Sequence, residues 1–366
     1  MKKLKKFITK PHLFFRDALN KKYPEINNEQ GIRENDEGAV ISHQDNLEIL
    51  ETSLLNTKNP IDVVFTWVND KDERWKAKKQ YYAQLSQDVA LYGKDDARFE
   101  EHNELFFAVK SVQKFLPWIR YIFIITDEQT PDLLDTDNQQ IKIIDHTALI
   151  DEKFLPTFNS HVIEAHLHKI PNLSENFIYF NDDVFVARPL NRSHFFKPNG
   201  LASLFLSVKN LDKMYAKGTA TPTLLASMNS RRLLRKLYGQ ELNAQTPLIH
   251  SYVPLKRSVF DKLWQEFPNE INAFLSNKFR SKNDLNLATF FVPYAMYLEG
   301  KSVITPEVCY YFNIRSANAA AQYKKLLRKK NTVNQPHSFC ANDFHSKINI
   351  PNYKELLIKI LEEYYK

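Results

Sequence analysis

The apolar residues between positions 60 and 180 follow two alternating patterns. Short runs with the composition of β-strands occur at 61–67, 119–126, 141–145 and 177–180, and a polar break follows each of them. Between the first two runs, residues recur at helical spacing before Pro117, namely Leu105, Ala108, Val109, Val112 and Leu116. Strands that alternate with helices predict an α/β fold with a mostly parallel sheet.

The second half of the chain has a different pattern, with longer segments of helical periodicity. These are "SVFDKLWQEF", "LNLATFFVPYAMYLEG", "AAAQYKKLLRKK" and the terminal "YKELLIKILEEYYK". We therefore expect the carboxyl-terminal part of the protein to be largely helical.

The pattern also divides the chain into segments. Residues 1–22 are basic and place Leu4, Phe7, Ile8, Phe14, Phe15 and Ala18 roughly on one helix face, as in a segment that lies on an anionic membrane surface. A solvated basic arm is the alternative. Residues 23–59 are polar and weakly periodic, which predicts a linker or arm. We expect an ordered domain at 60–345 and a terminal helix at 346–366.

Composition adds limits on class and compartment. The chain has 366 residues, of which 43% are hydrophobic, and this is enough apolar material for a folded core. Only two cysteines, Cys309 and Cys340, argue against a disulfide framework and favour a reducing, cytoplasmic location. A formal charge of +7 suggests an anionic partner, such as a nucleic acid, a membrane surface or a phosphorylated substrate. The sequence contains no run of about 18 apolar residues, so it predicts no membrane-spanning helix.

Polar residues follow three of the predicted strands, at Asn69-Asp70, Thr126-Asp127 and Asn181-Asp182-Asp183. In open α/β sheets, ligands bind at the carboxyl ends of strands. The pair Asp182 and Asp183 has neither Cys nor His beside it in the sequence, and oxygen ligands of this kind suit Mg²⁺ or Mn²⁺. A solvated turn is the alternative, since Asp and Asn are common turn residues.

Three further groups could carry chemistry. His161, Glu164 and His168 share a helix face and imitate a zinc site, but no Cys and no H-E-x-x-H motif supports zinc, so we expect a structural or substrate-contacting role. His250 could be a general base or a packed residue. Arg280 and Arg315 could grip phosphate or lie on the surface. The sequence contains no P-loop, dinucleotide-binding or serine-hydrolase motif.

Read together, four stretches resemble the Stealth family of hexose-1-phosphate transferases, over roughly residues 60–345. "IDVVFTWVNDKD" is similar to the first block of that family, and the segment from "ARFEEHNELFF" to "FIYFNDDVFV" is similar to the second. "LIHSYVPLKRSVFDKLWQEFP" with "FRSKNDLN" resembles the third block, and "SFCANDF" resembles the fourth. One departure is "TDEQTP", where relatives often have an Asn-Gly turn, so that Asp127 and Glu128 add negative charge near the pocket.

The resemblance implies a Rossmann-like, GT-A-like α/β core that depends on Mg²⁺ or Mn²⁺. It implies transfer of a hexose-1-phosphate, usually an N-acetylhexosamine-1-phosphate, from a UDP-sugar to a hydroxyl of a capsular glycan, with release of UMP. The implied partners are these two substrates, an anionic membrane surface and capsule-assembly proteins, but no nucleic acid. The rival interpretations are a metal-dependent glycosyltransferase that releases UDP, and a peripheral membrane protein that organises capsule assembly without catalysis.

Residue by residue, the resemblance implies a site that draws on all four blocks. The catalytic set is His250, Arg280, Asp284 and Asp62, and the metal ligands are Asp182 and Asp183. The substrate-binding set is Trp67, Asn69, Asp70, Arg98, Asn103, Glu104, Arg315, Asn342 and Asp343. Within these sets we expect His250 to be the base on the acceptor hydroxyl, with Arg280 and Arg315 as phosphate clamps.

Overall fold

A computed structural model describes residues 2–15, 59–86, 89, 93, 99–218, 220–343 and 350–366. The chain divides into two units, residues 1–57 and 58–366. The first unit contains the helix α1 (Lys2–Thr9), and the rings of Phe7 and Phe14 lie 5.1 Å apart. Residues 16–22 of the predicted membrane-binding segment, and the predicted linker up to residue 58, lie outside the described residues. Within the described ranges, no helix is long and apolar enough to cross a bilayer.

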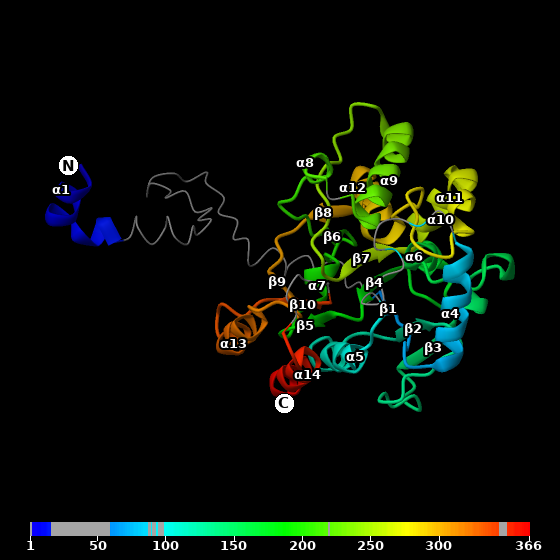
Figure 1. Ribbon diagram of the computed structural model, residues 1–366. Helices are drawn as coiled ribbons and strands as arrows, with labels where there is room; N and C mark the ends of the chain where they lie inside the picture. The colour runs from blue at the N-terminus through cyan, green and yellow to red at the C-terminus, as the bar shows by residue number, and fades with distance from the viewer. Residues whose placement is uncertain are drawn as a thin grey trace. The chain divides into compact units, whose positions relative to one another are not determined.

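The large unit is built on a five-stranded sheet within the described residues, with the strand order β3-β2-β1-β4-β7 (Figure 1). Its strands are β1 (Ile61–Thr66), β2 (Ile122–Thr126), β3 (Ile141–Asp145), β4 (Asn176–Asn181) and β7 (Val253–Lys256). The first four pair in parallel, whereas β7 is antiparallel to β4. The α/β fold with a mostly parallel sheet is therefore confirmed.

Two smaller sheets accompany the central one. The strands β5 (Val184–Val186), β10 (Ser338–Asn342) and β9 (Cys309–Asn313) form a sheet in that order, with β10 in the middle. The strands β6 (Ala202–Leu204) and β8 (Ser302–Ile304) form a parallel pair. Because β5 follows β4 after only two residues, the turn at Asp182 and Asp183 joins the central sheet to the three-stranded sheet.

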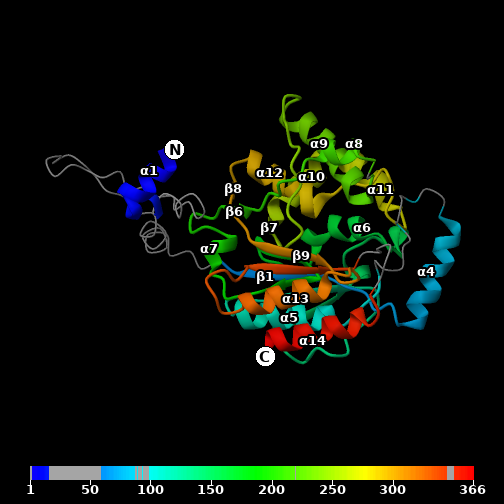
Figure 2. The same cartoon turned by 60° about the vertical axis from the view of Figure 1, so that its left-hand side comes forward.

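Helices cover the central strands on two sides. The helices α5 (Glu104–Phe115), α13 (Ala319–Lys329) and α14 (Tyr353–Tyr365) lie on one side, and α6 (Ser160–Ala165), α9 (Pro222–Tyr238), α10 (Arg257–Glu266) and α12 (Val292–Leu298) lie on the other (Figure 2). The remaining α-helices are α4 (Glu73–Leu85), α7 (Arg192–Phe195), α8 (Leu211–Ala216) and α11 (Pro268–Leu275). A π-helical turn, Leu287–Phe291, precedes α12, and short 3₁₀ helices span His146–Ala148, Glu152–Phe154 and Leu167–Lys169.

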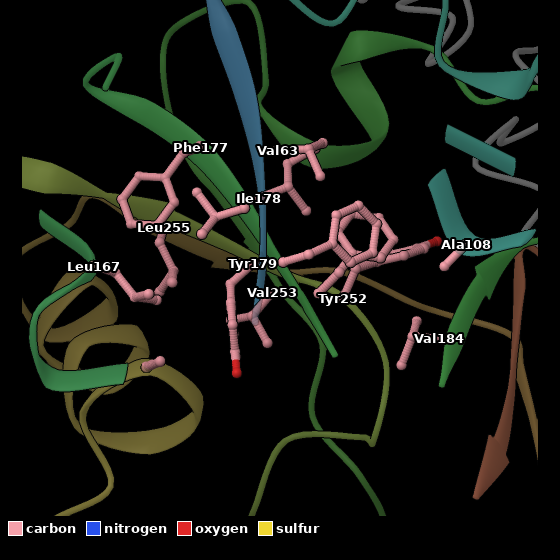
Figure 3. Packing of buried hydrophobic residues seen from close by; sticks show 14 of the residues in the cluster. Val63, Ala108, Leu167, Phe177, Ile178, Tyr179, Val184, Tyr252, Val253 and Leu255 are labelled. Carbon is pink, nitrogen blue, oxygen red and sulfur yellow. The ribbon is translucent and has the colours of Figure 1, made fainter. Parts of the chain in front are cut away.

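The apolar runs form strands because both faces of the central sheet are covered, and such strands are buried on both sides. Val63 pairs with Ile178, and Phe177 pairs with Leu255, and all four side chains are fully buried (Figure 3). Each such side chain contributes roughly 1.5–3 kcal/mol to folding. The core therefore fixes the strands whose carboxyl ends carry the candidate site.

The predicted elements agree with the structure where the pattern is long. The four predicted strands correspond to β1 to β4, and the four helical segments of the second half correspond to α10, the π-helical turn with α12, α13 and α14. The second half also contains β7 to β10, which the helical pattern did not indicate. The terminal helix is part of the large unit, since the Tyr365 hydroxyl donates to the Val186 carbonyl at 2.7 Å.

Candidate active site

A cavity of about 390 Å³ opens at the carboxyl ends of β1 and β4. Residues from segments far apart in the sequence line it. Among the predicted site residues these are Trp67, Glu104, Asp182, Asp183, His250, Arg280, Asn342 and Asp343. The size and the convergent polar groups are typical of a small-molecule binding site. The fold thus brings most of the predicted site into one place.

Asp183 lies in this cavity and is hydrogen-bonded through one of its two carboxylate oxygens. Its Oδ2 atom accepts hydrogen bonds from the Cys340 thiol and the Asn342 side-chain amide, both at 3.1 Å. His250 Nε2 lies 3.4 Å from the same oxygen. Neither Cys nor His lies beside the acidic pair in the sequence, but β10 and the segment before β7 bring Cys340 and His250 next to Asp183 in space. The Oδ1 atom is buried and has no partner among the described residues.

The other carboxyl groups near the acidic turn, those of Asp182 and Glu104, lie in surroundings that disfavour their charged form. Burial, together with the charges of Asp183 and Glu101, raises the pKa of Asp182 to about 7. Burial and the nearby Asp182 carboxylate also raise the pKa of Glu104 well above its ordinary value. Although burial opposes ionisation, the charge of His250 and the hydrogen bonds from His250, Cys340 and Asn342 lower the pKa of Asp183. The cavity therefore holds several carboxylates but favours the charged form of Asp183.

These observations fit a bound divalent cation. A divalent cation would pair with the orphaned carboxylate oxygen of Asp183 and would favour the charged form of Asp182, whose pKa is raised. Asp183, His250 and Cys340 also lie close enough to hold one ion. However, burial and the Asp183 charge raise the pKa of the Cys340 thiol, which donates its hydrogen bond to Asp183. A protonated thiol is a poor metal ligand, so the donor set favours oxygen ligands.

His250 lies at the mouth of the cavity, where 42% of its side chain is exposed. Its ring contacts the edge of Tyr311, with ring centroids 5.8 Å apart. Although burial opposes protonation, the Asp183 carboxylate raises the pKa of His250. No hydrogen bond to Nδ1 is found among the described residues, so this nitrogen is open to a substrate while Nε2 faces Asp183.

Arg280 lies on the wall formed by α6. Its guanidinium donates to the Ser160 hydroxyl, with Nε at 3.2 Å and Nη2 at 2.5 Å, and to the Thr223 hydroxyl at 3.3 Å. These partners are neutral, and among the described residues no carboxylate forms an ion pair with Arg280. The cation is therefore held in place while its charge stays available to an anionic substrate.

Asp284 lies behind this wall and does not line the cavity. It is fully buried and accepts hydrogen bonds from Asn159, Asn277, the Ser281 backbone and His161 Nδ1, at distances of 2.9 to 3.0 Å. A carboxylate that already accepts four hydrogen bonds and contacts no cavity surface cannot take a proton from a substrate. The structure therefore places Asp284 behind His161 and not in the cavity, and its catalytic role stays a prediction that this position does not favour.

The helix face with His161, Glu164 and His168 does not form a metal site. The helix α6 ends at Ala165, and His168 stacks on Phe260 with centroids 5.5 Å apart. Only His161 and Glu164 line the cavity. The expected structural or substrate-contacting role of this face fits these positions.

A second cavity of about 220 Å³ contains part of the predicted substrate-binding set. Trp67 lines both cavities, and Asn69 and Asn103 line the second. The Trp67 indole N–H is buried and has no partner among the described residues. Asp70 lines neither cavity and accepts a hydrogen bond from the Glu101 backbone at 3.0 Å. Arg98 lies outside the described residues.

Arg315 is occupied by protein contacts. It forms a bidentate ion pair with Asp343, lies 3.3 Å from Glu100, and stacks on Tyr353 at 4.5 Å. His102 Nε2 lies 3.0 Å from the same Asp343 carboxylate. Arg315 lines neither cavity, so its expected role as a phosphate clamp gives way to a role in holding Asp343 at the cavity wall.

The positions of Asp62, and of Asp127 with Glu128, differ from those expected from the sequence. Asp62 lies near the amino end of β1, at the opposite end of the strand from the cavity, and its fully buried carboxylate pairs with Arg120. The structure therefore does not bring Asp62 into the site. The negative charges of Asp127 and Glu128 are both paired with Lys78, at 3.0 and 3.3 Å, and neither lines a cavity.

Comparison with known proteins identifies three matching regions. Residues 59–86 match "Stealth protein CR1, conserved region 1", residues 98–204 match "Stealth protein CR2, conserved region 2", and residues 249–297 match "Stealth protein CR3, conserved region 3". These regions contain Asp182, Asp183, His250 and Arg280. The resemblance of "SFCANDF" to a fourth block stays a prediction.

Similar proteins and structures were also found. The chain is 76% identical to "Capsular polysaccharide phosphotransferase fcs1" of Haemophilus influenzae over 95% of this chain and 96% of that protein. It is 54% identical to "Capsular polysaccharide phosphotransferase LcbA" of Neisseria meningitidis over the full length of both. A crystal structure of the galactosyltransferase LgtC has a TM-score of 0.40 and 12% identity, over 82% of this chain and 95% of that one.

Proposed function

Because the chain belongs to the Stealth family, we propose that it is a capsular polysaccharide phosphotransferase that moves a hexose-1-phosphate from a UDP-sugar to a glycan hydroxyl and releases UMP. The transferred sugar is an N-acetylhexosamine in this proposal. The relatives with 76% and 54% identity are named capsular polysaccharide phosphotransferases, and they align over almost the whole chain.

The observation that carries the proposal is the shared cavity. It places an acidic turn, a histidine and an arginine without a carboxylate partner among the described residues around one space of about 390 Å³. Phosphoryl transfer needs little covalent chemistry from a protein, because positioning and charge stabilisation supply most of the acceleration. The groups in this cavity are suited to both tasks.

In the proposed reaction, the oxygen of the acceptor hydroxyl attacks the phosphorus that carries the sugar. The bond between this phosphorus and the bridging oxygen breaks, and the electron pair leaves with UMP. His250 accepts the hydroxyl proton at Nδ1, while Nε2 faces Asp183. Arg280 binds the phosphoryl oxygens, and Ser160 and Thr223 hold its guanidinium in position.

Asp182 and Asp183 would hold Mg²⁺ or Mn²⁺, with the orphaned Oδ1 atom of Asp183 as one ligand. When bound, the ion would neutralise charge on the donor diphosphate. Asn342 and Cys340 fix the other oxygen of Asp183, and Arg315 with His102 fixes Asp343 at the same wall. At the nucleotide end, Trp67, Asn69 and Asn103 offer a ring and amides along the second cavity.

The products of the reaction test this proposal. Purified protein with Mg²⁺, a panel of UDP-sugars and capsular oligosaccharides should yield UMP and a phosphodiester, both detected by mass spectrometry. Stoichiometric UDP with a phosphate-free glycosidic product would instead identify a glycosyltransferase. If no nucleotide product forms with any donor and acceptor, a non-catalytic role in capsule assembly would be favoured.

A peripheral position on the cytoplasmic face of the membrane is also part of the proposal. In α1 and the residues after it, Leu4, Ile8 and Phe15 are more than half exposed, and basic residues accompany them. Such a segment gains roughly 1 kcal/mol for each cation near an anionic surface. Removal of residues 1–22 should reduce co-sedimentation with phosphatidylserine vesicles at low salt. Equal binding by the full-length and truncated proteins would contradict this.

A further inference from the structure

Two polar side chains on α6 face the cavity with unused capacity for hydrogen bonds. His161 is 1% exposed and Glu164 is 5% exposed, yet both line the cavity. They are three residues apart on one helix, so their side chains are neighbours on the same face. Buried polar groups are normally paired, and one that is not paired with protein is a candidate for pairing with a ligand.

The orientation of His161 is fixed from behind. Its Nδ1 atom lies 2.9 Å from Asp284 Oδ2, and the Asn159 amide, the Asn277 amide and the Ser281 backbone supply the other hydrogen bonds of that carboxylate. Because Asp284 can only accept, Nδ1 carries the proton in this contact. The Nε2 atom has no hydrogen-bond partner among the described residues, and in the neutral ring it presents a lone pair.

The carboxylate of Glu164 also has unused capacity to accept hydrogen bonds. Its carboxylate accepts one hydrogen bond among the described residues, from the Tyr179 hydroxyl at 3.4 Å. A carboxylate has about four lone-pair positions, so most of its capacity is unused. The wall therefore offers acceptors, and the groups that complement it are O–H and N–H donors.

The neighbouring residues indicate which part of a substrate lies here. Arg280 donates to Ser160, the residue before His161, and so marks the position of the phosphate beside this wall. The group attached to that phosphate in a nucleotide-sugar is the hexose, whose hydroxyl and acetamido groups are O–H and N–H donors. This step rests on the proposed function.

We infer that His161 and Glu164 form the hexose-binding subsite of the donor and determine which sugar is transferred. A site built to pair with hydroxyl groups discriminates strongly against a sugar that leaves its buried acceptors unpaired. His168 provides an internal comparison on the same segment, since it is also buried but stacks on Phe260 outside the cavity.

Calorimetric titration of the full chain tests the inference without an acceptor. The probes are UDP-N-acetylglucosamine, UDP-N-acetylgalactosamine and UDP, each with Mg²⁺. His161→Asn can keep a donor toward Asp284 and removes Nε2, and Glu164→Gln keeps the shape of the side chain. Each variant should bind the preferred UDP-sugar about tenfold more weakly, while its affinity for UDP stays at the wild-type value. His168→Phe preserves the aromatic stacking and should bind all three probes as the wild type does.

The outcomes separate this inference from the proposal on which it rests. Equal weakening for UDP and UDP-sugars, or no weakening in either variant, would overturn the hexose subsite. A wild-type chain that binds neither UDP-sugar would overturn the proposed function itself. Melting temperatures of the variants, measured in parallel, establish that the titrated proteins are folded.

Discussion

The paired strands β1 and β4 have carboxylates near both ends of the pair, with Asp62 near the amino end of β1 and Asp182 and Asp183 directly after β4. At the amino end, Asp62 accepts two hydrogen bonds from the Arg120 guanidinium, at 2.9 and 2.6 Å, and one each from the Tyr121 and Ser174 backbones. At the carboxyl end, Asp182 and Glu104 have raised pKa values, and one oxygen of Asp183 has no partner among the described residues.

This difference between the two ends distinguishes a carboxylate that stabilises the fold from carboxylates that serve binding or catalysis. A carboxylate whose hydrogen bonds all come from the protein has nothing left to offer a ligand, and it stabilises the fold. A group of carboxylates that repel one another costs stability, and this cost persists only where binding or catalysis requires the charges. Four changes to the molecule would break or sharpen this contrast, beginning with the largest expected effect.

His250→Ala should lower kcat by about 10²- to 10⁴-fold, because a general base is removed from the carboxyl end. The affinity for the donor should stay near the wild-type value, since the ring faces the cavity mouth. Steady-state turnover and calorimetric titration of a UDP-sugar measure the two effects separately. A variant with wild-type turnover would make His250 a structural residue.

Asp183→Asn should lower kcat by about 10²-fold or more, because charge stabilisation in the transition state is lost while the side chain keeps its size. The melting temperature should not fall greatly, since the carboxyl end carries excess negative charge. In the wild type, Mg²⁺ or Mn²⁺ added after EDTA treatment should raise the melting temperature, and the variant should not respond. An identical response in both proteins would contradict the metal assignment.

Asp62→Asn should have the opposite profile, with a loss of roughly 2–3 kcal/mol in the free energy of unfolding and near-normal kcat for the folded fraction. Breaking a buried ion pair on one side usually costs 3–5 kcal/mol, and the partial exposure of Arg120 reduces this. Urea denaturation measures the change. Asp151→Asn is the matched control, since its ion pair with Lys153 is exposed and should contribute little to stability. Loss of activity without loss of stability in Asp62→Asn would return Asp62 to the site.

The pH dependence of stability should also distinguish the two ends. The pKa of Asp182 rises from 3.8 to about 7 on folding, so its favourable contribution is complete below pH 3.8 and is lost as the pH rises toward 7. In EDTA, the free energy of unfolding of Asp182→Asn should therefore rise by about 2 kcal/mol relative to that of the wild type between pH 4 and pH 8. This figure allows for the solvent exposure of Asp182 at the cavity.

The comparison must be made as a difference between the two proteins. Burial lowers the pKa of His166 to about 4 and that of His168 to about 3, so both remove stability as the pH falls below 6.5. These histidines titrate in both proteins and cancel in the difference. A constant difference in melting temperature from pH 4 to pH 8 would show that Asp182 is not strained.

The sequence predicted the central sheet because its strands are continuous apolar runs, which only a sheet covered on both faces can bury. It also placed Asp182 and Asp183 at a strand end. The strands β5, β6 and β8 were not predicted, since three residues give too little pattern. The helix α9 was missed although Thr221 and Pro222 at its start and Gly239 after its end are recognisable signals.

The site was harder to predict than the fold, because its partners come from distant segments. Nothing near Asp183 in the sequence indicates Cys340, which lies next to it only because β10 pairs with β5. The predicted roles of Asp284, Arg315 and Asp62 depended on residue type, and a charged residue of the same type can face a ligand or an internal partner. For Asp62 a signal did exist, since Arg120 lies just before the neighbouring parallel strand.

The position of β10 in the middle of the three-stranded sheet has a consequence for the synthesis of the protein. The strands β5 and β9 leave the ribosome earlier, but they have no common neighbour until residues 338–342 insert between them. Until then, Asp183 lacks the hydrogen bonds from Cys340 and Asn342. A nascent chain, or a product of premature termination before this strand, can therefore form β1 to β4 without assembling a complete site. Activity should appear only after residues 338–342 have been made.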